Sequence, residues 1–420
     1  MVSGIIIWIA IVAAFIFVFR KHVEVHFPIF MLKNKGLGRW IYKKSKKHTR
    51  AIKVYADVGI VVGLLGVVFS VWFLANGLLR QVLNWVEGTA APASVSVVIP
   101  GVKIPGSAIY VPLLEGLIAI AILAIVHEFA HAAVASALKL KPKSVALVIM
   151  AFIPAAGVEL DEDKIKSKLS LRDRLRIYSA GSFTNFLIGG IFLTLTVGMM
   201  FFIMHFYAVP LGMKIATVEN NTAAYGILRE NMTIVKINNE PAVLQSELTN
   251  WDFMSTGGSK SISFYRIAGT LKANQTVVLE TDDGRVFNIT AGSWSASEPL
   301  RGRIGISSYP DIKITGGIMV SVLAWFFSLF GLIATMNLGV GLFNLYPLSI
   351  LDGGRIVSDI IEDRFPKRHK MIILGVFGVA LFILLGTLFP TLFGILKALL
   401  LFVLDLFLQL FRVSAAFKLF

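Results

Sequence analysis

His127-Glu128-Phe129-Ala130-His131 stands near the end of an apolar stretch, residues 113–138. On an α-helix, residues four positions apart lie on one face, so both imidazoles can bind one metal ion while Glu128 approaches its water. An ionisable side chain at the centre of a membrane helix costs about 2.5 kcal/mol or more. Three such groups within five residues therefore indicate a functional site. The alternative is a polar patch on a packed helix.

The rest of the chain is dominated by similar apolar stretches. Of its 420 residues, 56% are hydrophobic and only 15% are charged, whereas about 25% are charged in soluble domains, so a soluble globular protein is excluded. About 20 apolar residues suffice to cross the hydrocarbon core. Six stretches are long enough: 58–79, 113–138, 177–204, 318–345, 372–389 and 392–411. A shorter one, 4–19, is interpreted as an uncleaved anchor. Only Pro390-Thr391 separates the last two, so the sequence predicts six or seven helices.

Charge predicts the orientation of these helices. The net charge is +15, and residues 20–54 contain eleven bases and one acid. Basic loops are retained on the cytoplasmic side. We therefore expect a multi-pass cell-membrane protein with its N-terminus outside, cytoplasmic loops at 20–54, 139–176 and 352–370, and outer loops at 80–112 and 207–313. We interpret the basic arm as a topology signal that also contacts anionic lipid headgroups of the bilayer, and we expect no nucleic-acid partner.

A catalytic zinc site normally has three protein ligands, and the chain has no cysteine. We expect the third ligand to be Asp352, in Asn344-Leu-Tyr-Pro-Leu-Ser-Ile-Leu-Asp352-Gly-Gly. The predicted helix before it ends on the same side of the membrane as His131. Pro347 and the two glycines break that helix, and irregular backbone at membrane depth is tolerated only where protein buries it or water lines it. An Asp before glycine is by itself typical of an ordinary turn.

These motifs together resemble the site-2 protease family of intramembrane zinc metalloproteases. The run from Leu175 to Asn185 (Leu-Arg-Ile-Tyr-Ser-Ala-Gly-Ser-Phe-Thr-Asn) is similar to the Ala-Gly-Pro-x-x-Asn stretch of that family, with Ser182 in place of the proline. The resemblance covers about residues 113–354. Residues 212–241, within the long outer insert, resemble part of a PDZ domain.

The resemblance implies the roles of the polar residues. It implies one zinc ion per chain, held by His127, His131 and Asp352, and it makes Glu128 the general base. Asn185 and Asn344 become candidates for stabilising the oxyanion; hydrogen bonding between helices is the alternative for both. The implied activity is hydrolysis of peptide bonds within transmembrane segments of other membrane proteins, as in regulated intramembrane proteolysis.

The expected fold class is an α-helical polytopic membrane protein with an inserted mixed α/β PDZ-like extracytoplasmic domain. We divide the chain into N-terminal membrane helices and loops (1–110), a first part of the catalytic core (111–207), the PDZ-like domain (208–313), a second part of the core (314–371) and C-terminal membrane helices (372–420).

Two other classes of function compete with the protease. One is a non-catalytic membrane adaptor that keeps zinc for structure and presents its PDZ-like domain; an intact Glu128 argues against it. The other is a zinc transporter, which needs polar groups along a path to both faces, whereas this chain places them on one side. The sequence leaves open the substrate, any preceding protease, the ligand of the PDZ-like domain and the oligomeric state.

Overall fold

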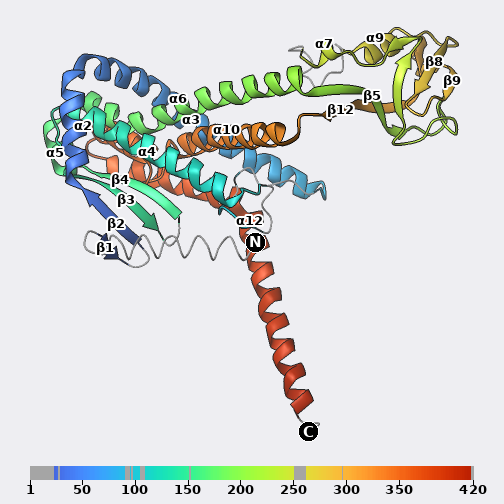
Figure 1. Cartoon of the computed structure of the whole chain (residues 1–420). Coiled ribbons are helices and arrows are strands. Elements are labelled where there is room, and N and C mark those ends of the chain that lie inside the picture. Colours follow the sequence, from blue (N-terminus) through green and yellow to red (C-terminus); the bar gives the residue numbers. More distant parts are fainter. Residues whose placement is uncertain are drawn as a thin grey trace. The chain divides into compact units, whose positions relative to one another are not determined.

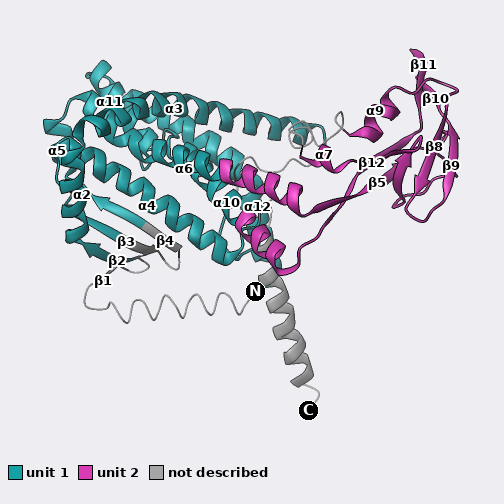
Figure 2. Cartoon of the chain, turned by 45° about the horizontal axis from the view of Figure 1, so that its top comes forward, with its two compact units in different colours: residues 1–193, 329–420 teal, residues 194–328 magenta. Residues whose placement is uncertain are grey.

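The computed structural model describes residues 23–26, 29–89, 95, 98–104, 109–150, 153–249, 262–295 and 297–417. The chain divides into two compact units (Figure 2). The first contains residues 1–193 and 329–420, and the second contains residues 194–328. The predicted N-terminal anchor, residues 4–19, lies outside the described residues.

Five helices among the described residues are long and apolar enough to cross a membrane. They are α3 (Thr49–Val86), α4 (Leu113–Ala137), α6 (Leu171–Phe206), α10 (Gly317–Asn344) and α12 (His369–Phe417) (Figure 1). Each includes an apolar stretch identified in the sequence. The chain is therefore a multi-pass membrane protein.

The last two apolar stretches form one helix, α12, which continues through Pro390. Proline removes a backbone donor, but membrane helices tolerate it where neighbouring groups satisfy the backbone that it disturbs. Here the Thr387 carbonyl, in the turn before the proline, accepts a hydrogen bond from Gln81 Nε2 at 3.3 Å. The break expected at Pro390-Thr391 is therefore absent.

A four-stranded antiparallel sheet joins two segments that the sequence analysis treated only as cytoplasmic loops. Its order is β1-β2-β3-β4, and its strands are β1 (Val23–His26), β2 (Ile29–Asn34), β3 (Ser144–Met150) and β4 (Ile153–Glu159). Helix α2 (Lys35–Lys47) follows β2, and α5 (Glu162–Lys168) follows β4. The sheet was not predicted because β2 and β3, which pair directly, lie far apart in the sequence.

Glycines let α3 approach the helices that carry the site. Gly59, Gly63 and Gly66 are buried on one side of α3. A Cβ at Gly63 would overlap the Ser179 side chain, and one at Gly66 would overlap Leu345. Small residues at such spacing permit close backbone contact between membrane helices. Helix α3 therefore supports α6 and the chain that follows α10.

The second unit contains a separate β-sheet region with its own core. Its sheet has the order β12-β5-β6-β8-β9, with β7 beside β6, and a hairpin, two short helices and the strands make up the region: β5 (Ala208–Val218), β6 (Thr233–Ile237), β7 (Glu240–Pro241), α7 (Gln245–Leu248), α9 (Ser263–Gly269), β8 (Thr276–Thr281), β9 (Val286–Thr290), β10 (Gly292–Ser295), β11 (Glu298–Arg303) and β12 (Ile306–Ile314). Met213, Ile234 and Val277 are fully buried. Because β5 pairs with β12 from Ala208 to Ile314, the region begins and ends at neighbouring positions.

Candidate metal centre

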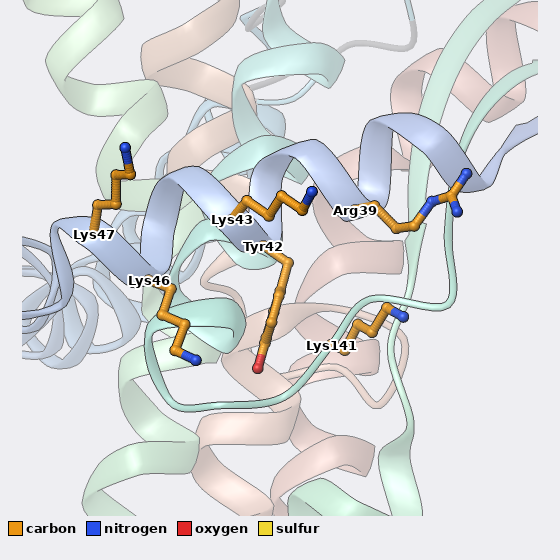
Figure 3. Close-up of a pocket in the computed structure, with 6 residues that line it drawn as sticks. All are labelled: Arg39, Tyr42, Lys43, Lys46, Lys47 and Lys141. Carbon is orange, nitrogen blue, oxygen red and sulfur yellow. The ribbon is translucent and has the colours of Figure 1, made fainter.

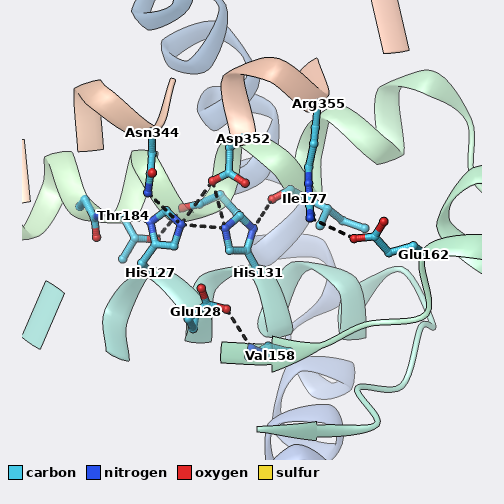
Figure 4. A network of polar contacts seen from close by, with 12 residues as sticks. His127, Glu128, His131, Val158, Glu162, Ile177, Thr184, Asn344, Asp352 and Arg355 are labelled. Atoms are coloured by element: carbon cyan, nitrogen blue, oxygen red, sulfur yellow. Dashed lines mark hydrogen bonds and ion pairs between the residues drawn. The ribbon is translucent and has the colours of Figure 1, made fainter. Parts of the chain in front are cut away.

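Helix α4 supplies two imidazoles to a buried polar cluster. His127 and His131 are 7% and 9% exposed, and their Nε2 atoms lie 3.1 Å apart. The i, i+4 spacing places both on the same face of the helix. Figure 4 shows both rings directed toward Asp352.

Asp352 reaches the same point because the chain after α10 turns tightly. It is the first residue of α11 (Asp352–Arg364). A Cβ at Gly353 would overlap the carbonyl of Leu345, and one at Gly354 would overlap that of Leu348. Only glycine permits so close an approach of two backbones. The Asp-Gly-Gly sequence thus allows α11 to begin against the turn and directs its carboxylate to the histidines.

The three side chains form a nearly equilateral group of ligand atoms. Asp352 Oδ2 lies 3.3 Å from His127 Nε2 and 3.2 Å from His131 Nε2. Tetrahedral zinc with bonds of about 2.0–2.2 Å requires ligand atoms about 3.3–3.6 Å apart. Asp352 Oδ2 is also buried and has no hydrogen-bond partner among the described residues, so a cation would satisfy it. The size and chemistry of this group fit one zinc ion.

The outer nitrogens of both rings have partners that direct Nε2 inward. His131 Nδ1 lies 2.7 Å from the Ile177 carbonyl, to which it donates. His127 Nδ1 lies 3.1 Å from the amide of Asn185, which is fully buried. With its oxygen toward the ring, this amide accepts the Nδ1 proton, leaves Nε2 free for a metal and gives a partner to Asn185 Oδ1, which otherwise has none in the described chain. Such contacts fix the tautomer and orientation of metal ligands.

The two asparagines singled out by the sequence occupy different sides of His127. Asn185 contacts Nδ1, the nitrogen directed away from Asp352, and is therefore placed to orient the ring. Asn344, the last residue of α10, has its amide nitrogen 3.4 Å from Nε2. The amide of Asn344 is thus the one beside the ligand atoms, where a reacting carbonyl oxygen can accept a hydrogen bond from it.

Glu128 is directed toward the β-sheet of the first unit. Its Oε2 accepts a hydrogen bond from the backbone N–H of Val158, in β4, at 2.9 Å. Figure 4 shows this contact beside the two histidines. Among the described strands, β4 is at the end of the sheet and pairs only with β3. The unpaired edge of β4 therefore faces the glutamate.

Ion pairs tie α11 to its surroundings beyond Asp352. Arg174 Nε, on α6, lies 3.1 Å from the buried Asp359 carboxylate, and Arg355 lies 3.0 Å from Glu162 on α5. Burial raises the pKa of the Asp359 carboxyl above its ordinary value, and the nearby Arg174 opposes this. These contacts hold α11 against the helix that carries the partners of both histidines.

A buried His-His-Asp group beside a glutamate, among helices that cross a membrane, defines a polytopic membrane protein with the ligand set of a metal-dependent hydrolase. The model of Peptidase family M50 matches residues 115–385, more than half of the chain, and the chain belongs to that family. This confirms the resemblance to site-2 proteases and places the chain among the membrane metalloproteases. A search of curated proteins finds no match.

Gly181 is a site residue that the sequence analysis quoted without assigning it a role. It lies on α6 directly against the ligands, and a Cβ there would overlap His131 Nε2 and the ring of His127. The spacing of the histidines gives no sign of this contact, because Gly181 comes from another helix. The only signal was the Ala-Gly pair in the run from 175 to 185.

We predict that Gly181→Ala removes bound zinc while the protein stays folded, because the new methyl group displaces both imidazoles from Asp352. Gly198→Ala is the matched control, since it lies on the same helix and its Cβ would meet nothing within 4 Å. Zinc content by elemental analysis and thermal unfolding check both variants. Stoichiometric zinc in Gly181→Ala would show that the ligand geometry differs from the one described.

Proposed function

We propose that this chain is a zinc endopeptidase that hydrolyses peptide bonds within transmembrane segments of other membrane proteins. The observation that carries the proposal is the triangle of ligand atoms from His127, His131 and Asp352, with Glu128 beside it, in a member of a membrane peptidase family. One zinc ion per chain is the implied cofactor.

The residues around the triangle divide the chemistry between them. Zinc held there supplies Lewis-acid activation, because it lowers the pKa of water to about 7 and polarises a carbonyl. Glu128 takes a proton from the attacking water and then gives it to the leaving amide nitrogen. The Val158 N–H stabilises the ionised carboxylate before reaction. The Asn344 amide donates to the carbonyl oxygen as negative charge develops on it.

The substrate is proposed to react in an extended form. A peptide bond within a helix is covered by neighbouring turns, so the segment must unwind before it meets Glu128. The unpaired edge of β4 lies beside Glu128, and such an edge holds an extended peptide through backbone hydrogen bonds. Helix-breaking residues in the substrate are therefore expected to favour cleavage.

Cleavage of a single-span substrate by the purified protein in detergent tests the proposed function. We expect two fragments whose junction, placed by mass spectrometry, falls within the apolar span. Removal of zinc with 1,10-phenanthroline should stop the reaction, and added zinc should restore it. Cleavage that survives chelation, or that falls only outside the span, would contradict the proposal.

The two asparagines are predicted to fail in different ways when shortened. Asn344→Ala should lower kcat by about 10²- to 10³-fold with zinc retained, because it removes a donor to the developing oxyanion. Asn185→Ala should instead weaken zinc binding by about 10- to 100-fold, because it frees the ring of His127. Zinc affinity and kcat measured on both variants distinguish the roles, and equal effects on both quantities would count against the division.

We further propose that the β-sheet region of the second unit is a PDZ-like extracytoplasmic domain that screens substrates by bulk. Its separate core and its neighbouring ends support an independent insert. The basic segments next to the first residue of α3 and the last residue of α4 support an active site toward the cytoplasm and an outer location for this region. The proposed partners are transmembrane substrates within the lipid bilayer.

Deletion of residues 208–313 is predicted to broaden cleavage toward substrates whose outer domains are still intact. The reason is that a bulky outer domain would no longer be excluded from the site. Rates for one substrate with and without its outer domain, measured on both forms of the protease, check this. Unchanged selectivity in a deletion form that retains zinc would refute the screening role.

A further inference from the structure

A second polar feature of the first unit lies on α2 and on the connection between α4 and β3. A cavity of about 660 Å³ opens there (Figure 3). We refer to it as the basic pocket, and its lining residues are Arg39, Tyr42, Lys43, Lys46, Lys47 and Lys141. Five of the six are cationic, and Tyr42 adds a phenol.

The positive charge of the basic pocket is not compensated by the protein. No carboxylate in the described part of the chain forms an ion pair with its lysines or its arginine. Nearby basic residues differ in this respect, since Lys143 lies 3.9 Å from Glu159 and Lys164 lies 2.7 Å from Asp161. Clustered like charges repel one another, so this arrangement favours an anionic ligand.

Helix α2 has the character of a helix that lies at a membrane surface. One face packs inward, where Ile41 is 4% exposed and contacts Ala132 and Val145. The other face carries Trp40, which is 54% exposed, together with lysines one and two turns further along. Tryptophan and lysine together mark the headgroup level of membranes.

The ends of two membrane helices place the basic pocket at that level. Helix α2 ends at Lys47, and the membrane helix α3 begins at Thr49. Lys141 follows closely on the last residue of α4, Ala137. Since α2 also packs against Ala132 of α4, both helix ends lie at one membrane boundary. The phosphates of the lipids lie at the same boundary.

From these observations we infer that the basic pocket binds the phosphate of an anionic phospholipid headgroup. Figure 3 shows the Tyr42 side chain extending from α2 between Lys46 and Lys141, where its hydroxyl can donate to a phosphate oxygen alongside both ammonium groups. A bound headgroup joins α2 to the α4–β3 connection through these contacts. Neutral phosphatidylcholine lacks the net charge that five cations favour.

Native mass spectrometry of the purified full-length protein, titrated in detergent with dioleoyl phosphatidylglycerol or dioleoyl phosphatidylcholine, tests the inference. Wild type should retain phosphatidylglycerol preferentially. A variant with Lys43→Glu, Lys46→Glu and Lys141→Glu should bind it at least about tenfold more weakly. The affinity for phosphatidylcholine should not change.

The matched control has the same change of charge at the same membrane boundary but outside the basic pocket. It combines Lys168→Glu, Lys367→Glu and Lys370→Glu, all exposed residues next to the first turns of α6 and α12. It should bind phosphatidylglycerol as wild type does. An equal loss in the control would overturn the inference, because total charge rather than the pocket would then determine binding. Thermal unfolding of all three proteins verifies that they are folded.

Inorganic phosphate and pyrophosphate separate a lipid from a soluble phosphate compound. A ligand that binds only the folded state raises its unfolding temperature. We expect a rise with phosphatidylglycerol in wild type that the pocket variant loses, and none with either free phosphate. A rise with pyrophosphate and none with the lipid would overturn the assignment to a headgroup.

Discussion

Glu128→Gln is expected to lower the rate of peptide cleavage by about 10²- to 10⁴-fold while zinc stays bound. Glutamine has nearly the same shape as glutamate, and its amide oxygen can still accept the Val158 N–H. The carboxamide cannot take a proton from water, however, so only the proposed proton transfer is lost. His127, His131 and Asp352 remain in place, because none of them contacts the Glu128 carboxylate in the described structure.

Zinc content and cleavage rate must be measured on the same preparation to interpret this variant. Glu115→Gln is the matched control, since it makes the same change in the first turn of α4. The control should cut as wild type does. Cleavage by Glu128→Gln at the wild-type rate would show that another group is the base. A wild-type protein that binds zinc and cuts no helix-destabilised substrate would instead favour the non-catalytic adaptor.

Asp352→Asn is expected to weaken zinc binding by more than about 100-fold and to abolish cleavage. Loss of a residue that merely supports a ligand already costs about 10- to 100-fold, and Asp352 is proposed to be a ligand. The substitution preserves the shape of the side chain but removes its negative charge. The two imidazoles, about 3.2 Å from Oδ2, then have no carboxylate to complete the site.

Asp363→Ala is the matched control, because it removes a carboxylate from the other end of α11 at an exposed position. Competition with a zinc chelator of known affinity gives the dissociation constant for each variant. The control should match wild type in both zinc binding and cleavage. Wild-type zinc affinity in Asp352→Asn would mean that the third ligand comes from another residue.

The sequence predicted the membrane helices well because their signal is local. The stretches at 58–79 and 177–204 lie within α3 and α6, and the length and apolarity of each stretch suffice to identify it. Pro390 was a weaker guide, because the backbone partner from Gln81 belongs to another helix. The sheet of the first unit was missed for a similar reason: its central strands pair across a long sequence separation.

The candidate site shows the same division. The spacing of His127 and His131 determined by itself that they share a helix face, because helical periodicity is a property of the local chain. The motif around Asp352 indicated a third ligand, yet nothing in it gives a distance. The contact of Asn185 with Nδ1, the contact of Glu128 with Val158 and the position of Gly181 were all decided by tertiary packing.

The sequence by itself therefore determined the membrane class, the pair of histidines on one face and the family. The tertiary structure alone decided which asparagine lies behind the ring, which strand meets the glutamate and where the cations of α2 gather with Lys141. The physical reason is range. Apolarity and helical period act over a few turns of one segment, whereas these contacts depend on how closely separate helices and strands can pack.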